Sequence, residues 1–168
     1  MKKFELTTES ITNEVGKKLF RIKALIDFGD VKAGEPGGYV EKEGNVSQDD
    51  NARVSGNAWV SGNAKVYDNA WVYDNAWVSG NARVSGDALV FGDADYALVQ
   101  GFGTEFRCTT FYRGKDKKIM VNCGCFHGNL EAFRKQAKET RSGKIAKEYL
   151  MIADLMEYHF ASEDSSDE

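Results

Sequence analysis

The 168-residue sequence has one proline, three cysteines and two histidines, and it has no apolar run long enough to cross a membrane. Met1-Lys2-Lys3 gives a positive start, but no apolar segment follows it, so we expect no signal peptide and a cytoplasmic protein. The net charge is −4, and four acidic residues lie in the last seven positions, which leaves the rest of the chain neutral. A neutral body argues against binding along a nucleic-acid backbone, which needs clustered lysine and arginine.

A six-residue unit occurs seven times between Asn51 and Gly92, as NARVSG, NAWVSG, NAKVYD, NAWVYD, NAWVSG, NARVSG and DALVFG. A short fixed period predicts a solenoid in which each unit supplies one strand and one turn. Ala and Val are two residues apart and therefore point to the same side of a strand, which we predict to be the interior. The predicted inward residues are Val54, Val60, Val66, Val72, Val78, Val84 and Val90, with Ala52, Ala58, Ala64, Ala70, Ala76, Ala82 and Ala88. Asn, Asp and Gly fall between the strands, where they tolerate the left-handed backbone conformation of a tight corner.

This unit resembles the hexapeptide repeat of left-handed parallel β-helices. The resemblance implies three strands per coil, so that residues 18 apart stack on one another. Looser copies at residues 38–40, 45–46 and 93–96 extend the repeat, with a two-residue insertion before Val54 and Tyr96 as the last inward position. The expected fold is mainly β, a short left-handed parallel β-helix of about three coils that needs a cap at each end.

The N-terminal cap is predicted within residues 1–37, followed by the solenoid at residues 38–98. Apolar positions within residues 4–28, placed around a Thr/Ser/Asn/Gly-rich segment, predict a β-hairpin. Pro36 lies in a Gly-rich turn that leads into the solenoid.

The C-terminal cap is predicted at residues 99–161 as a β-hairpin followed by two helices, with an acidic disordered tail at residues 162–168. The hairpin is expected within residues 105–125. Asn129 can N-cap a helix to about residue 141, and Ser142 a second one over residues 144–160. The second helix has an apolar stripe of Ile145, Tyr149, Ile152, Leu155, Met156 and Phe160.

Aromatic and basic side chains occupy outward positions of the repeat, including all three tryptophans of the chain. A solvated face has no need of tryptophan, and a contiguous aromatic patch usually marks an interface or a ligand surface. Three explanations remain open: a cap that folds back over one face, contact between copies of the chain, or a foreign ligand or partner. The predicted binding residues are Arg53, Trp59, Lys65, Tyr67, Trp71, Tyr73, Trp77, Arg83 and Phe91.

A second group of residues is the run Cys123-Gly124-Cys125-Phe126-His127. On one straight strand Cys123, Cys125 and His127 would share a side, and a hairpin centred between Lys115 and Asp116 would place Cys108 across from Cys123. These four residues are the candidate zinc ligands, but positions i, i+2 and i+4 span about 13 Å along a strand, which fits tetrahedral zinc poorly. We therefore expect no metal, with buried core thiols preferred to a metal site or to a catalytic Cys125/His127 pair.

The β-helices that this repeat resembles are best known as acyltransferases, which use a histidine as general base between subunits. The two histidines of this chain, His127 and His159, lie outside the repeat, and no loop interrupts the repeats between Asn51 and Gly92. We therefore expect no catalysis and no cofactor, and keep an acyltransferase as an alternative.

A closer resemblance covers nearly the whole chain. Residues 19–25, 28–34, 37–41 and 45–48, the NAxV repeats, and the Cys-Gly-Cys-Phe and Leu130-Glu131-Ala132-Phe133 segments resemble phage- and prophage-encoded hexapeptide-repeat proteins. The resemblance implies an accessory protein in the host bacterial cytoplasm. We expect a homo-oligomer, with a trimer favoured, that binds or sequesters a host protein or a nucleotide-type signal and counters bacterial defence. A purely structural oligomeric scaffold is the other alternative.

Overall fold

The computed structural model describes residues 1–92 and 95–161, which fall into two compact units, Met1–Asp95 (unit 1) and Tyr96–Glu168 (unit 2). The acidic tail and the Asp93-Ala94 step of the expected last repeat lie outside the described residues. Within those residues, none of the helices has the length and apolar character needed to span a membrane.

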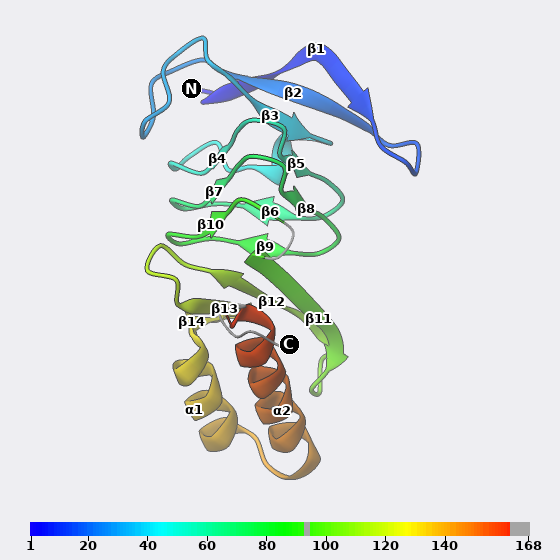
Figure 1. Ribbon diagram of the computed structural model, residues 1–168, viewed down its shortest axis with the longest axis vertical. Coiled ribbons are helices and arrows are strands. Elements are labelled where there is room, and N and C mark those ends of the chain that lie inside the picture. Colours follow the sequence, from blue (N-terminus) through cyan, green and yellow to red (C-terminus); the bar gives the residue numbers. More distant parts are fainter. Residues whose placement is uncertain (93–94, 162–168) are drawn as a thin grey trace, which may run out of the picture. The chain divides into compact units, whose positions relative to one another are not determined.

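Unit 1 begins with an antiparallel hairpin of β1 (Phe4–Thr12) and β2 (Lys18–Ala24), which confirms the predicted N-terminal hairpin (Figure 1). β3 (Pro36–Val40) pairs antiparallel with β2 and parallel with β5 (Trp59–Val60). The hairpin and the repeat strands therefore share one sheet, of order β1-β2-β3-β5-β8. Because its backbone bonds to both, β3 fixes the hairpin against the first repeats.

The repeat itself consists of two-residue strands that stack in parallel with a spacing of 18 residues (Figure 1). Beside the sheet that contains β5, one sheet has the order β10-β7-β4 and another pairs β6 with β9. The strands are β4 (Arg53–Val54), β6 (Lys65–Val66), β7 (Trp71–Val72), β8 (Trp77–Val78), β9 (Arg83–Val84) and β10 (Leu89–Val90), preceded by a 3-10 turn, η1 (Glu43–Asn45). The spacing is 20 residues at Val40 and Val60 and at Val46 and Val66, which confirms the two-residue insertion before Val54.

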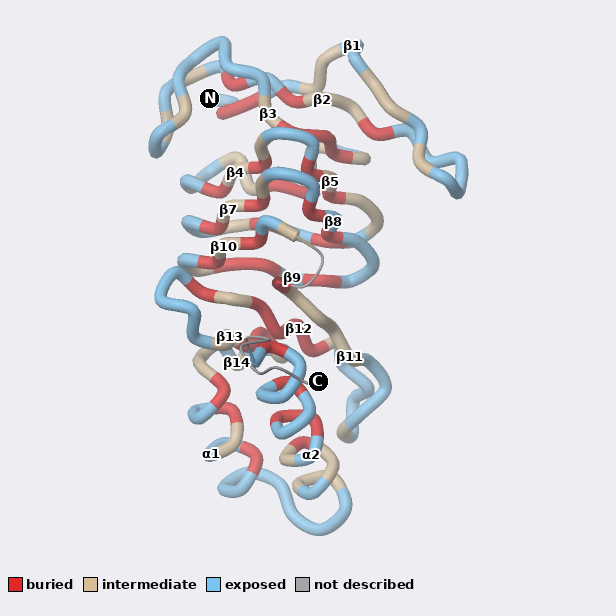
Figure 2. The backbone as a smooth tube through the Cα atoms, viewed as in Figure 1, coloured by how far each residue is buried: buried red, intermediate tan, exposed pale blue. Residues whose placement is uncertain are grey.

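The interior of the repeat is a column of valine and alanine, as the period of two predicts. Every predicted inward Val and Ala from Ala52 to Val90 is at most 2% exposed (Figure 2). At the corners the backbone adopts positive φ at four glycines and at Asp68 and Asp74. The predicted extension of the repeat to Tyr96 is wrong, because Tyr96 begins β11 of unit 2 and pairs antiparallel with Tyr112.

A buried lysine joins the N-terminal segment to the repeat. Lys3 is 2% exposed, and its Nζ donates to the backbone oxygens of Asp50 (2.9 Å) and Ala52 (2.7 Å) and lies 4.5 Å from the Phe28 ring centroid. Burial lowers the pKa of this amine, and the carboxylate of Asp50 opposes that shift. The cap is thus fixed by specific polar contacts as well as by strand pairing.

Unit 2 is an antiparallel sheet of order β11-β12-β13-β14, followed by two helices. Its elements are β11 (Tyr96–Phe102), β12 (Arg107–Arg113), β13 (Ile119–Cys123), β14 (Phe126–Asn129), α1 (Leu130–Thr140) and α2 (Gly143–Phe160). The predicted hairpin and both helices are confirmed, and the Asn129 side chain caps α1 by accepting from the Ala132 amide. Tyr149, Ile152, Met156 and Phe160 enter the core, whereas Leu155 is 58% exposed and does not belong to the buried stripe.

Candidate functional site

The tryptophans of β5 and β8 form a stacked pair on the outside of unit 1. The ring centroids of Trp59 and Trp77 are 4.5 Å apart and the planes differ by 9°. This geometry follows from the parallel register, which places Trp59 beside Trp77 while Val60 and Val78 fill the interior. Trp77 is 44% exposed, so the stack presents a large apolar surface to solvent.

The loop between β1 and β2 borders this stack and forms a groove with it. Asn13, Glu14, Val15 and Lys17 of the loop line one side, and the other side consists of Trp59, Ser61, Gly62, Trp77, Ser79 and Gly80. Val15 is 78% exposed at the tip of the loop. We call this feature the Trp59–Trp77 groove.

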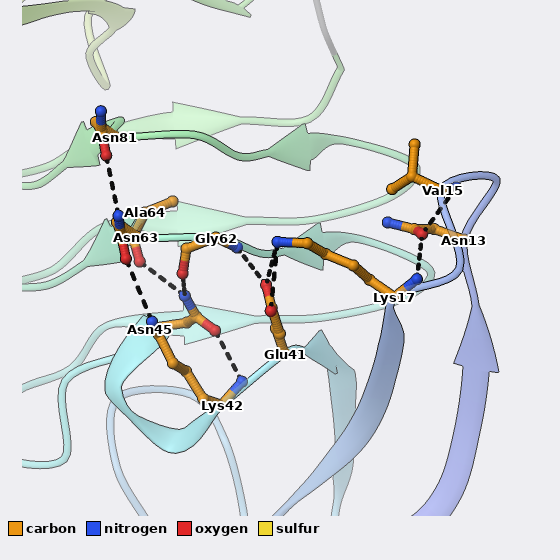
Figure 3. Close-up of polar contacts among 10 residues, drawn as sticks. All are labelled: Asn13, Val15, Lys17, Glu41, Lys42, Asn45, Gly62, Asn63, Ala64 and Asn81. Atoms are coloured by element: carbon orange, nitrogen blue, oxygen red, sulfur yellow. Dashed lines mark hydrogen bonds and ion pairs between the residues drawn. The ribbon is translucent and has the colours of Figure 1, made fainter.

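Polar contacts hold the loop in place (Figure 3). Asn13 Oδ1 accepts from the amides of Val15 (3.1 Å) and Lys17 (2.8 Å), which closes the turn. Lys17 Nζ lies 3.4 Å from the carboxylate of Glu41, and Glu41 Oε2 accepts from the Gly62 amide at 2.5 Å. The bond from Gly62, supported by Lys17, lowers the pKa of Glu41. The loop is therefore tied to the backbone turn that forms the opposite side of the groove.

A buried asparagine also holds the backbone turn at Gly62 in place. Asn45 is fully buried, and its Nδ2 donates to the carbonyl oxygens of Gly62 (3.1 Å) and Ala64 (2.9 Å), while its Oδ1 accepts from the Lys42 amide (Figure 3). Above it Asn63 donates to Asn81, one repeat spacing further along. The bonds from Asn45 therefore fix the backbone of residues 62–64, beside the parallel bridge between Val46 and Val66.

A second aromatic cluster lies on the sheet of β4, β7 and β10, and its members mostly contact one another. The Arg53 guanidinium lies 4.2 Å from the Trp71 ring centroid and 3.2 Å from the carboxylate of Asp30. The rings of Trp71 and Tyr73 lie 4.3 Å apart, and that of Phe91 lies 5.7 Å from Tyr73. Asp30 belongs to the N-terminal cap, so a segment of this cap contacts the face of β4, β7 and β10. A cap that folds back over one face was one of the three explanations for the outward aromatic residues.

The third group of predicted residues, Lys65, Tyr67 and Arg83, lines a shallow groove on the sheet of β6 and β9 with the acidic residues Glu43 and Asp49. The nine predicted binding residues therefore belong to three separate clusters, one on each sheet. The contribution of the hairpin loop to this surface was not predictable from the sequence, in which only turn-forming residues such as Asn13 and Gly16 mark the loop.

Residues 50–62 and 64–80 match the family model of the YdcK β-solenoid repeat. This chain is a β-solenoid repeat protein. No curated protein matches the sequence.

The Cys/His cluster predicted outside the solenoid does not form. Residues 114–118 make a five-residue loop, so Thr109 pairs with Cys123, and the expected pairing of Cys108 with Cys123 is wrong by one residue. A slip of one residue moves a side chain to the other face of the sheet, so Cys108 and Cys123 lie on opposite faces.

The expected straight strand through residues 123–127 is also wrong. Gly124 and Cys125 form a two-residue turn, Gly124 with a φ of 59°, and Cys123 pairs with Phe126 across it. His127 instead lies beside Asn122, and its Nδ1 is hydrogen-bonded to the Asn122 side chain.

The three cysteines, all in the described part of the chain, form no disulfide, and Cys125 is exposed where a buried thiol was expected. Among the described residues no three His, Cys, Asp or Glu side chains gather as a metal ion would require.

Proposed function

We propose that the protein is a non-catalytic binding module that engages a protein partner through the Trp59–Trp77 groove. The observation that carries the proposal is the stacked tryptophan pair, bordered by a loop that Lys17 and Glu41 hold in place. Rigid aromatic rings supply a large contact area at little cost in conformational entropy, and tryptophan is enriched among residues that dominate binding energy. A partner would insert an apolar or aromatic side chain between the rings and Val15.

The charge of the groove favours a protein over a nucleotide. The charged side chains that line the described groove are Glu14 and Lys17, and Lys17 is engaged by Glu41. Arg53 lies on another sheet, where it forms an ion pair with Asp30, and Lys65 lies on the third sheet of the repeat. A nucleotide would need an aromatic surface and phosphate-binding cations at one place, so the nucleotide-type ligand is the less favoured occupant.

The finer parts of the proposal rest on the sequence resemblance. They are a left-handed coil of about three turns, a homo-oligomer with a trimer favoured, and a phage or prophage accessory protein in the host bacterial cytoplasm. Its partner there would be a host protein, bound to counter a defence. Native mass spectrometry of the full chain tests the copy number directly.

The binding proposal is tested by site-specific photo-crosslinking in bacterial cells. A photoreactive amino acid replaces Ser79 in the groove or, as a control, Lys65 on the sheet of β6 and β9. We expect one heteromeric product of defined mass from Ser79 and none of that mass from Lys65. The product should disappear with Trp77→Ala and persist with Trp77→Phe.

Phe91→Ala provides a matched variant, because Phe91 is a similarly exposed aromatic residue (50% against 44%) on a different sheet. It should leave the product from Ser79 unchanged. A product that contains only copies of this chain would instead identify the groove as an oligomer contact. That result, or the absence of any product, would refute the foreign-partner proposal.

A further inference from the structure

Unit 2 contains a pocket that the binding proposal for unit 1 does not use. Its walls come from the turn between β11 and β12, the turn between β13 and β14, the C-terminal half of α1, and Tyr149 of α2. Phe102, Phe126 and Phe133 supply aromatic surface to these walls. These rings share the pocket with several polar and charged side chains, so its lining offers both apolar surface and groups that could orient a ligand.

Two arginines line the same pocket. Arg107 forms an ion pair with Glu105, which also lines the pocket. The Arg141 side chain has no hydrogen bond or ion pair with any described residue. The charged lining thus carries one more positive than negative group, and Arg141 is the cation without a protein partner in the described part of the chain.

Two carbonyl oxygens near the end of α1, which borders the pocket, have partners within the chain. The carbonyl oxygens of Gln136 and Ala137 are already hydrogen-bonded, the first to the Thr140 hydroxyl (2.7 Å) and the second to the Arg141 amide (3.1 Å). The Arg141 amide thus satisfies the carbonyl of Ala137, one of the four at the end of α1 that lack a partner within the helix.

Two of the polar side chains pack directly over glycines. A Cβ atom at Gly124 would overlap the Arg107 guanidinium, and one at Gly103 would overlap the Tyr149 hydroxyl. Both glycines have positive φ, 59° and 78°, a backbone conformation that other residues rarely adopt. Burial raises the pKa of Tyr149, whose hydroxyl is protonated at neutral pH even without that shift and can donate a hydrogen bond.

We propose that this pocket binds a small organic anion that carries an aromatic ring. The ring packs against Phe102, Phe126 and Phe133, and the anionic group is bound by the guanidinium groups of Arg141 and Arg107. A planar guanidinium matches a carboxylate, sulfonate or phosphate through paired hydrogen bonds, which a lysine does not provide.

The test compares two probes that share their rings but differ in charge. The anionic probe is 1-anilinonaphthalene-8-sulfonate and the uncharged one is N-phenyl-1-naphthylamine. Each is titrated into the full chain, followed by its own fluorescence and by amide NMR shifts. We expect the sulfonate to bind more tightly and to shift the amides of Gly103, Gly124 and Arg141.

Arg141→Gln should weaken the sulfonate about tenfold, the effect of one charge-assisted hydrogen bond, and leave the neutral probe unchanged. Arg141 is exposed, so the substitution does not threaten folding. Lys138→Gln removes the same charge from the same helix end without touching the pocket, and should have little effect.

Three results would overturn the proposal. Equal affinity for both probes would exclude charge recognition, and equal losses in Arg141→Gln and Lys138→Gln would reduce it to a general electrostatic effect. Shifts confined to unit 1 would place the bound probe elsewhere, for example in the Trp59–Trp77 groove. None of these results bears on the crosslink from Ser79, so the two proposals fail independently.

Discussion

The stacked pair Trp59/Trp77 predicts a measurable coupling in the stability of unit 1. A centroid distance of 4.5 Å with nearly parallel planes lies within the range in which aromatic pairs contribute about 1 kcal/mol beyond their buried area. Trp59→Ala should cost more than Trp77→Ala, because Trp59 is half-buried and Trp77 is 44% exposed. Each single variant loses the stack, so the double variant should lose about 1 kcal/mol less than the sum of the two.

Urea unfolding followed by tryptophan fluorescence measures this cycle. All three tryptophans lie in unit 1, and Trp71, outside the stack, remains as the reporter in every variant. As a control, Trp59→Ala combined with Lys65→Ala should be additive, because Lys65 lies on a different sheet. A coupling below about 0.3 kcal/mol in the tryptophan cycle, within the usual additivity error, would refute the stack as a structural contact.

Two further predictions concern unit 1 and use the same assay. Gly80→Ala should cost about 1 kcal/mol through backbone strain alone, because Gly80 has a φ of 64° and no atom lies within 4 Å of an added Cβ. Gly44→Ala, equally open but outside the left-handed region, should be near neutral, and equal costs would contradict the strain argument. For Lys3, burial lowers the pKa of the amine in the folded state below the usual 10.5. At pH values between the folded-state and the unfolded-state pKa, the unfolded chain therefore binds more protons than the folded one, and the free energy of unfolding rises with pH. The stability of wild type relative to Lys3→Met should therefore increase between pH 7 and pH 10, and a constant or falling difference would show that the amine is not desolvated.

The repeat made much of unit 1 predictable. Each Val and Ala faces inward because strands alternate sides with a period of two, and a period of 18 residues brings Trp59 onto Trp77. The helix of unit 2 that begins after Asn129 was equally predictable, since its cap is a local hydrogen bond. Leu155 shows the limit of predicting burial from helical spacing, because an apolar residue next to the buried stripe can still face solvent.

The Cys/His cluster failed for a specific reason. The prediction required an even number of residues in the loop between β12 and β13. It also required a straight strand after Cys123. The chain instead has a five-residue loop and a turn at Gly124. One residue in a loop changes which side chains share a face, and no periodic signal in this part of the sequence specifies the loop length.

The sequence by itself determined the stacked repeat, its buried Val and Ala column, and the outward placement of the tryptophans, because these follow from short-range alternation repeated along the chain. Only the tertiary structure decided that the loop at residues 13–17 borders Trp59 and Trp77, that Asp30 binds Arg53, and that Arg107 and Arg141 line one pocket. These contacts join residues that are far apart in sequence, and each contact involves at least one residue outside the repeat. Their positions depend on how whole elements pack and on loop geometry, which no local pattern encodes.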